Sequence, residues 1–328
     1  MRAMPRLRVL QKVADLDALD LRIEPDADLP RGADDLLIAV RYAGVNPSDV
    51  RATMGVMPQA VFPRTPGREW AGVVLEGPAE FIGREVFGAG GDLGITRDGS
   101  HASRLVVPCT AAVTRPARLS PAEAGSLGVP FVTAALSYRE AQLPRPGEVV
   151  LVMAANGKVG QAAVQIAAWH GARVFGVVRR DEPFAGPGDV PVRMIDASSH
   201  DIAEVVRDET GGHGADLVIN TVGSPYFAAA NTAMAHGARQ VLMSTQERQV
   251  PFDIFGFYRG RHRYFGIDTL ALDATASAEL LRALLPGFES GELRPFAVDE
   301  ATCFTLERAK DAYRAAAGSA RERVVLRI

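Results

Sequence analysis

The sequence predicts an α/β fold in which a doubly wound parallel sheet is joined to a β-rich module. Up to about Pro121, short β-branched runs are separated by glycine, proline and asparagine turns. From about Ser120, apolar strands alternate with helical segments, which is typical of a parallel sheet with helices on both faces. The last residues, about 60 in number, are too few for a core of their own, and we expect them to return to the first module.

The β-rich module is predicted from its turns and its β-branched runs. "DLLIAVRYAGVN" (Asp35 to Asn46) and "WAGVVLEG" (Trp70 to Gly77) are two such runs, and "GREVFGAGG" and "HASRLVVP" continue the pattern. Glycine-rich turns at this spacing favour a compact β-barrel-like module.

The α/β region begins with Ser120 and Pro121, a good N-cap and first-turn pair for a helix. Strands are predicted at 149–153 and in "RVFGVVRR", "VPVRMIDA", "ADLVINTVG" and "RQVLMST", with helices at 157–170, in "DIAEVVRDET" and at 226–236. The segment "RRDEPFAGPGDVPVRM" contains too many glycines and prolines for a regular helix. We expect a loop there.

The bulk composition is that of an ordinary globular protein. The chain has 328 residues, of which 47% are hydrophobic and 23% charged, and its length suggests two domains. A net charge of −3 does not indicate a nucleic-acid partner, and two cysteines do not suggest a disulfide scaffold. Because the sequence shows neither a signal peptide nor a long apolar span, we expect a cytoplasmic protein with no membrane contact.

The most informative motif is "AANGKVG" (Ala154 to Gly160), which lies between an apolar strand and a helix. It reads AxxGxxG, because Ala154 replaces the first glycine of a dinucleotide-binding fingerprint; alanine fits if that turn does not need a positive φ. Gly157 would let the backbone approach a pyrophosphate, and Gly160 would let the helix pack closely on the sheet. The predicted phosphate-binding residues are Asn156, Gly157, Lys158, Val159 and Gly160.

The end of the second strand of this unit bears on the choice of dinucleotide. Arg179 and Arg180 come first, and two guanidiniums suit the 2′-phosphate of NADPH. Asp181 follows one residue later and would favour NAD if it bound the ribose hydroxyls instead. We predict NADPH, with an NAD-type arrangement as the alternative.

With these motifs in hand, the chain resembles the medium-chain dehydrogenases/reductases, and within them the zinc-independent quinone oxidoreductase and enoyl reductase branch. The resemblance rests on "AGVNPSD", "PGREWAGVV", "DGSHASRLVVP", "AANGKVG" and "YRGRHRYFGIDTL". It implies a GroES-like catalytic domain at 1–120, completed by 270–328, and a Rossmann NADP-binding domain at 121–269. It also implies a homodimer in which "RYFGIDTL" is an edge strand.

The resemblance also points to the positions that bind zinc in the zinc-dependent members. Those positions correspond here to Asn46, Arg68 and Val129, none of which is a plausible zinc ligand. We therefore expect no metal, and hydrogen-bond donors in place of the Lewis acid. Reduction of a quinone or of an α,β-unsaturated carbonyl C=C suits such a site better than alcohol oxidation, because nothing lowers a hydroxyl pKa.

The residue match assigns further roles. The catalytic candidates are Asn46, Ser48, Arg68 and Tyr258, although Asn46 before a proline could be only a turn residue. Asp49 would orient a neighbour, and Arg68 would be held by Asp49 or Glu69 while lending its charge to a developing oxyanion. Beyond the phosphate-binding residues, cofactor contacts are expected from Asn46, Thr133, Arg179, Arg180, Asn220, Thr221, Val222, Gly266 and Ile267.

One departure from the family pattern bears on the substrate. Met57 stands where enoyl reductases of this branch carry a tyrosine acid. The proton would then come from water, Tyr42, Ser48 or Tyr258, or thioesters are not substrates. The sequence therefore predicts an NADPH-dependent reductase of a small electrophilic acceptor. The alternatives are an enoyl-thioester reductase and a non-catalytic NADPH-binding or sensor protein.

Overall fold

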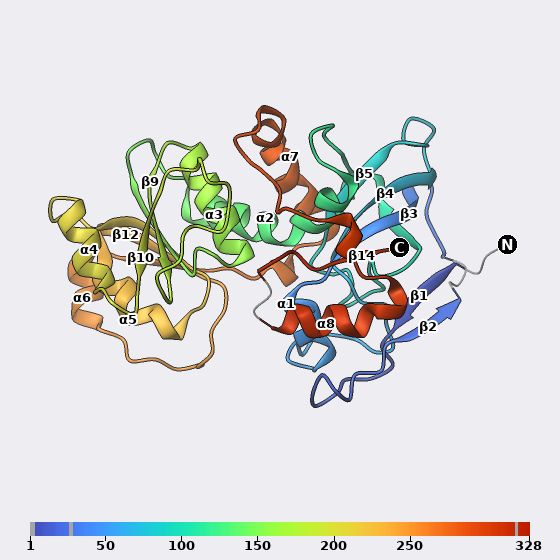
Figure 1. Cartoon of the computed structure of the whole chain (residues 1–328), viewed down its shortest axis with the longest axis horizontal. Helices are drawn as coiled ribbons and strands as arrows, with labels where there is room; N and C mark the ends of the chain where they lie inside the picture. Colours follow the sequence, from blue (N-terminus) through green and yellow to red (C-terminus); the bar gives the residue numbers. More distant parts are fainter. Residues whose placement is uncertain (1–3, 26–28, 319–320) are drawn as a thin grey trace. The chain divides into compact units, whose positions relative to one another are not determined.

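The computed structural model of the chain describes residues 4–25, 29–318 and 321–328. They form two compact units (Figure 1). Unit 1 comprises residues 1–132, 269–291 and 295–328, and unit 2 comprises residues 133–268 and 292–294. Among the described residues, no helix combines the length and the apolar character that crossing a membrane requires.

Unit 1 is built on an antiparallel sheet in which a strand from the end of the chain pairs with a strand from its beginning. The strand order is β14-β3-β4-β5-β7, with β6 also paired to β3. In Figure 1, β14 lies beside β3, which confirms that the tail returns to the first module. The bounds are β3 Asp35–Gly44, β4 Glu69–Glu76, β5 Glu85–Ala89, β6 Arg104–Pro108, β7 Val113–Thr114 and β14 Val325–Arg327, and a separate hairpin joins β1 Pro5–Arg8 to β2 Arg22–Pro25.

Two apolar cores stabilise unit 1. One lies on the main sheet around Ile38, Trp70 and Leu105, and α7 packs on β5 beside it. The other joins α1 to α8 around Val50 and Tyr313. The helices of this unit are α1 Pro47–Thr53, α7 Ala274–Ser290 and α8 Ala309–Ala317, with 3-10 turns η1 Cys109–Ala111, η2 Thr269–Ala271, η3 Glu300–Thr302 and η4 Leu306–Arg308.

A buried ion pair attaches the tail to the sheet. Arg323, two residues before β14, pairs with the carboxylate of Glu69 at the start of β4, and both side chains are almost fully buried. Arg323 also donates hydrogen bonds to the Ser126 carbonyl (2.5 Å) and the Val45 carbonyl (3.0 Å). Gly44 leaves room for the pair, because a Cβ there would lie 2.1 Å from Glu69 Oε1.

His101 is a buried structural residue beside this pair. Its Nδ1 lies 3.0 Å from the Tyr313 hydroxyl and its Nε2 lies 3.1 Å from the Gly44 carbonyl. Burial lowers the pKa of His101 to about 4, so the ring is neutral near pH 7. In the neutral ring, Nε2–H donates to the carbonyl and Nδ1 accepts from the hydroxyl.

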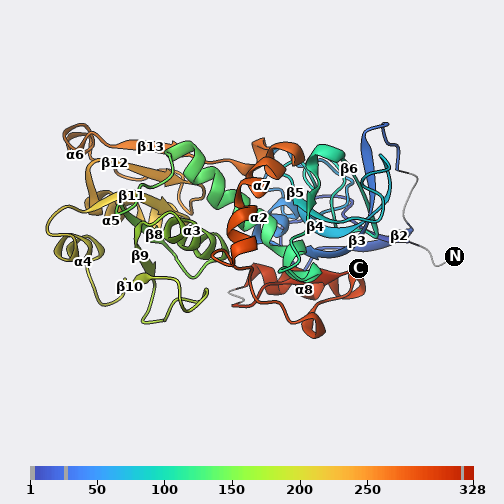
Figure 2. The same cartoon turned by 90° about the horizontal axis from the view of Figure 1, so that it is seen from above.

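Unit 2 contains a six-stranded parallel sheet, as predicted. Its order is β10-β9-β8-β11-β12-β13, so β13 is an edge strand, as expected for "RYFGIDTL" (Figure 2). Alternate residues of β8 pack with α4 and α5, and the intervening Val150 and Val152 are also buried, so both faces are covered. The bounds are β8 Val149–Met153, β9 Arg173–Val178, β10 Val192–Asp196, β11 Ala215–Asn220, β12 Met234–Leu242 and β13 Arg263–Gly266.

The helices of the α/β region follow the local signals in the sequence. In front of α2 (Pro121–Ala141), Ser120 and Glu123 form a capping box: Ser120 Oγ accepts the Glu123 N–H (3.2 Å) and Glu123 Oε2 accepts the Ser120 N–H (2.8 Å). No helix forms between β9 and β10, which confirms the predicted loop. The other helices are α3 Lys158–Trp169, α4 Ile202–Glu209, α5 Ser224–Ala233 and α6 Ile254–Gly260.

The turn between β8 and α3 is strained at one residue. Ala154 has φ = +56°, in the left-handed region that disfavours a side chain with a Cβ. Alanine would fit this turn without strain only if no positive φ were needed, and that condition is not met. The turn keeps the shape that a glycine would adopt, and Ala154 holds it at an energetic cost.

We predict that Ala154→Gly stabilises the protein by about 1 kcal/mol, because glycine adopts a positive φ without a Cβ clash. Chemical denaturation measures the change in the free energy of unfolding. Ala155→Gly is the matched control: Ala155 is fully buried and has no positive φ, so this change should destabilise the protein. A loss of stability in Ala154→Gly would contradict the account of the turn.

We predict that Glu69→Gln destabilises the protein by about 3–5 kcal/mol, because it leaves the buried Arg323 charge uncompensated. The control is Glu76→Gln, which breaks the exposed pair with Arg31 and should cost less than about 1 kcal/mol. Equal effects of the two changes on the free energy of unfolding would show that the buried pair does not hold the tail.

Candidate active site

In unit 2, the turn from β8 into α3 has the features of a phosphate cradle. Gly157 is exposed, and α3 starts directly after it with no side chain capping its first amides. A Cβ at Gly160 would lie 2.4 Å from the Ala154 carbonyl oxygen, so glycine is required there for the helix to approach the strand. The N-terminus of this twelve-residue helix suits an anionic phosphate.

Asn156 fastens the loop that follows β9 onto this turn. Its Nδ2 donates to the Pro183 carbonyl (3.0 Å), and its Oδ1 accepts the Ala185 N–H (2.8 Å). The same loop is fixed further along by an ion pair between Asp189 and Arg294. Asn156 therefore positions the loop, a contact that the motif alone did not indicate.

The carboxyl ends of β11, β12 and β13 surround a cavity of about 480 Å³. Gly266 and Ile267 line it, together with Gly223, Leu242 and Phe227. Ligands of parallel α/β sheets bind at this edge. The structure thus brings two of the predicted cofactor residues to one cavity.

Asn220 and Thr221 shape this edge of the sheet. Asn220 Oδ1 accepts the N–H groups of Val222 (3.2 Å) and Gly223 (2.8 Å), and its Nδ2 donates to the Gly223 carbonyl (3.0 Å). Thr221 Oγ1 donates to the Met153 carbonyl at the end of β8 (2.9 Å). The buried Asn220 side chain therefore stabilises the turn that contains Val222.

Arg179 and Arg180 are exposed directly after β9. The positive charge of Arg179 opposes the rise that burial causes in the pKa of Tyr226 on α5, so this guanidinium lies near Tyr226. Asp181 instead lines a cavity of about 200 Å³ at the end of β10, together with Asp196. Both groups that bear on the choice of dinucleotide are therefore accessible.

In unit 1, two of the three positions that match zinc ligands, Asn46 and Val129, contact one carboxylate. Glu69 Oε1 accepts a hydrogen bond from Asn46 Nδ2 (2.7 Å), and Oε2 accepts the Val129 N–H (2.7 Å). Asn46 Oδ1 in turn accepts from Arg323 Nη2 (2.9 Å). Both ends of the Asn46 amide are thus engaged, so Glu69 and Arg323 fix its orientation.

Arg68 lies next to Glu69 in sequence, and the sequence suggested Asp49 or Glu69 as the residue that holds it. The Glu69 carboxylate binds Arg323, Asn46 and the Val129 amide. Arg68 instead donates to Ser48 Oγ (3.1 Å), to Thr269 Oγ1 (3.2 Å) and, at 3.4 Å, to the Gly90 carbonyl.

Asp49 completes this polar cluster. Its Oδ2 accepts the Asn46 N–H (2.7 Å), which confirms that it orients a neighbour. Burial raises the pKa of its carboxyl, and the charge of Arg68 opposes that rise. Asp49, one of the two residues that the sequence suggested as a partner of Arg68, therefore interacts with it electrostatically.

The remaining predicted residues are more scattered. Thr133 is a buried residue of α2, and Tyr258 lies on α6 with 56% of its surface exposed. Lys158 and Val159 are half-buried in the first turn of α3. Of the candidates for catalysis, Asn46, Ser48 and Arg68 lie together in unit 1, whereas Tyr258 belongs to unit 2.

Two residues of the cluster were not identified from the sequence. Arg323 lies 254 positions from its partner Glu69, and Thr269 lies 201 positions from Arg68. The only local signal for Arg323 is an arginine directly before the apolar run "VVL", where a charge needs a partner.

The donor set of this cluster does not suit a catalytic metal. An amide and a guanidinium occupy two of the matched positions, and the Glu69 carboxylate is already neutralised by Arg323. Among the described residues, no group of three histidine, cysteine or carboxylate side chains has metal-binding geometry.

Two family models match the chain, one in each half. The alcohol dehydrogenase GroES-like domain model matches residues 32–116, and the zinc-binding dehydrogenase model matches residues 159–284. A zinc-type alcohol dehydrogenase-like protein of Schizosaccharomyces pombe is 34% identical over 265 residues, 79% of this chain and 78% of that protein. An alcohol dehydrogenase superfamily structure from Novosphingobium aromaticivorans has a TM-score of 0.86 at 24% identity, with 99% of both chains covered.

Other relatives are much longer than this chain. The mycoketide-CoA synthase of Mycobacterium tuberculosis is 30% identical over 90% of this chain, but the matched part is 7% of that protein. The two matched domain models, the yeast relative and the shared GroES-like and Rossmann-like architecture together show that the chain belongs to the medium-chain dehydrogenase/reductase family of NAD(P)-binding oxidoreductases.

Proposed function

We propose that this protein is an NADPH-dependent, zinc-independent reductase of quinones or α,β-unsaturated carbonyl compounds. The observation that carries the proposal is the polar cluster around Arg68 and Ser48, in which a guanidinium and a hydroxyl offer hydrogen-bond donors. Reduced nicotinamide, when bound, supplies the hydride. The residues of unit 1 then bind the oxygen on which negative charge develops, and a proton from water or from a hydroxyl such as that of Ser48 completes the reduction.

The Arg68–Ser48 hydrogen bond supports a defined role for each residue. Arg68 Nη1 donates to Ser48 Oγ, so the serine oxygen is an acceptor in this contact and its own O–H remains available to donate. Because the positive charge of Arg68 polarises the Ser48 oxygen, the Ser48 O–H becomes a stronger hydrogen-bond donor. Ser48 would donate to the acceptor oxygen, with Arg68 buried behind it as a permanent cation.

The preference for NADPH is supported by Arg179 and Arg180. Both are exposed at the end of β9, and a pair of guanidiniums there favours a 2′-phosphate over two free hydroxyls. Asp181 in the neighbouring cavity is the feature that would favour NADH instead.

We expect the purified protein to oxidise NADPH with 1,4-benzoquinone or an alkyl vinyl ketone, at a rate unchanged by prior dialysis against a chelator. Loss of the rate on chelation would overturn the zinc-independent proposal. Tight NADPH binding without turnover, across quinones, enones and enoyl thioesters, would support the non-catalytic alternative. Turnover of enoyl thioesters alone would identify the other enzymatic alternative.

The same assay tests the cofactor preference. Arg179→Gln with Arg180→Gln should raise the KM for NADPH about tenfold or more, through the loss of charge-assisted hydrogen bonds, and leave the KM for NADH nearly unchanged. Arg259→Gln, which removes an exposed guanidinium from α6, is the matched control. Equal changes for both cofactors would assign the arginines no role in recognising the phosphate.

A further inference from the structure

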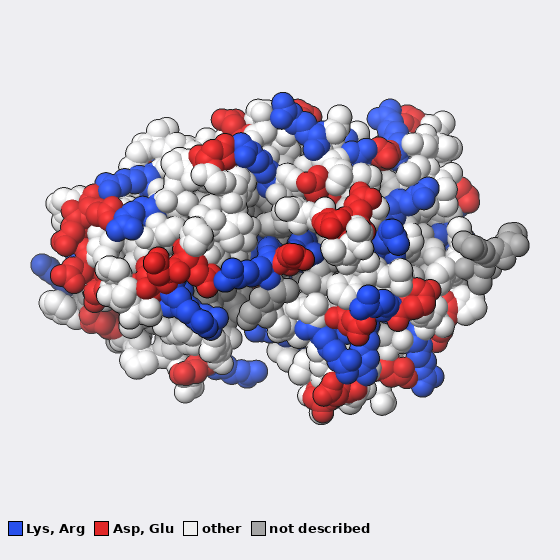
Figure 3. Space-filling model, in the orientation of Figure 1, with Lys and Arg blue, Asp and Glu red and all other residues white. Residues whose placement is uncertain are grey.

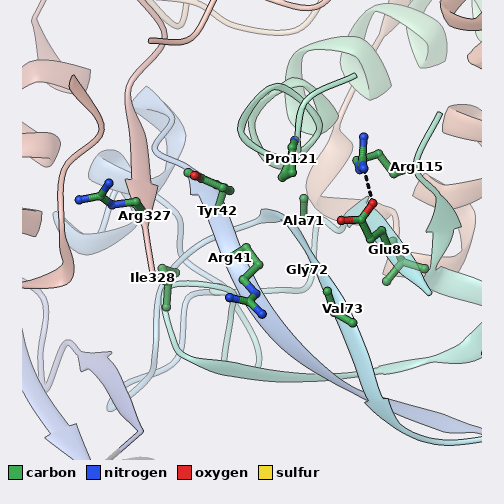
Figure 4. A pocket seen from close by; sticks show the side chains of 11 residues that line it. Arg41, Tyr42, Ala71, Gly72, Val73, Glu85, Arg115, Pro121, Arg327 and Ile328 are labelled. Carbon is green, nitrogen blue, oxygen red and sulfur yellow. Dashed lines mark hydrogen bonds and ion pairs between the residues drawn. The ribbon is translucent and has the colours of Figure 1, made fainter. Parts of the chain in front are cut away.

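We propose that unit 1 carries a second ligand site, for a small organic dianion with an apolar part, in a cavity formed by β3, β4, β5 and β14. The cavity measures about 370 Å³, which is the size of small-molecule sites in proteins. Figure 4 shows Arg41 and Tyr42 on β3, with Arg327 to one side and the Arg115–Glu85 pair to the other. Apart from Tyr42, which the sequence offered as one possible proton source, none of the residues assigned above to catalysis or to cofactor binding lines it.

A β-bulge places charge at this site. In the pairing of β3 with β4, Val40 is opposite Gly72 and Tyr42 is opposite Ala71, so Arg41 is an inserted residue without a partner of its own. Bulges re-aim side chains relative to the regular alternation of a strand. Both Arg41 and Tyr42 line the cavity, which the strict alternation of a strand would not favour.

The charges of the lining residues do not balance. Arg115 is neutralised by its ion pair with Glu85. Within the described residues, neither Arg41 nor Arg327 has a hydrogen bond or an ion pair from its guanidinium, although the charge of Arg327 acts on Tyr42. Elsewhere, on the face drawn in Figure 3, basic and acidic side chains are interspersed. Two guanidiniums in one cavity favour a doubly charged oxyanion.

Tyr42 and the aliphatic residues define the rest of the ligand. Burial and a hydrogen bond to Glu300 (2.8 Å) raise the pKa of Tyr42 to about 12, so the phenol adds no negative charge near pH 7. Val73, Val86 and Pro121 give the cavity an apolar part. An aryl or alkyl phosphate combines the two features that this lining recognises.

Phenyl phosphate is a suitable probe, and calorimetric titration of the full chain can be carried out with NADP saturating, so that the dinucleotide site is occupied. We expect one binding event that neutral benzamide does not reproduce. Arg41→Gln and Arg327→Gln should each weaken the binding about tenfold, and the two together should abolish it.

Arg84→Gln is the matched control, because it removes an exposed guanidinium of unit 1 that does not line the cavity and should leave binding unchanged. Thermal unfolding of each variant separates loss of the site from loss of the fold. Absence of binding, or binding that neither Arg41→Gln nor Arg327→Gln weakens, would overturn the proposal. Because oxidation of NADPH does not enter this measurement, its outcome is independent of the proposed reaction.

Discussion

The carboxylate of Glu69 is the point on which the arrangement of unit 1 depends. It lies fully buried at the start of β4 and binds Arg323, Asn46 and the main chain of Val129. Its partners come from the tail, from the residue that precedes α1, and from α2. A buried charge of this kind is tolerated only when it is paired and hydrogen-bonded, so the pairing brings distant segments to one place.

This interaction also explains why Arg68 is directed elsewhere. Because Arg323 already neutralises Glu69, the guanidinium of Arg68 is engaged instead by Ser48 and Thr269, with Asp49 nearby. At Arg68, one of the positions that the sequence resemblance matches to zinc ligands, the structure thus has a buried cation bonded to a hydroxyl. Both groups suit the stabilisation of an oxyanion, and neither can act as a Lewis acid.

Much of this arrangement could be predicted from local sequence. The strand–AANGKVG–helix segment predicted the tight turn from β8 into α3, and the glycines and prolines after Arg180 predicted the missing helix. These signals are short-range, because they depend on turn chemistry and apolar periodicity.

What the sequence could not supply was long-range pairing and backbone strain. The Arg323–Glu69 pair joins residues 254 positions apart, and no periodic pattern reports such a contact. The sequence left open whether Ala154 adopts a positive φ, and the fold imposes one. In both cases the tertiary structure determines the conformation or the partner of the residue. The same is true of Arg41, which lines a cavity because it lies in a β-bulge.

The most direct test of the central claim is the single-turnover rate of hydride transfer from saturating NADPH in Arg68→Met and Arg68→Lys. If a fixed cation beside Ser48 stabilises the oxyanion, Arg68→Met should lower the rate about a hundredfold with little change in NADPH affinity. Arg68→Lys should recover much of it, because the charge is restored. Equal losses of rate and NADPH affinity in both variants would contradict the account and leave Arg68 a structural residue.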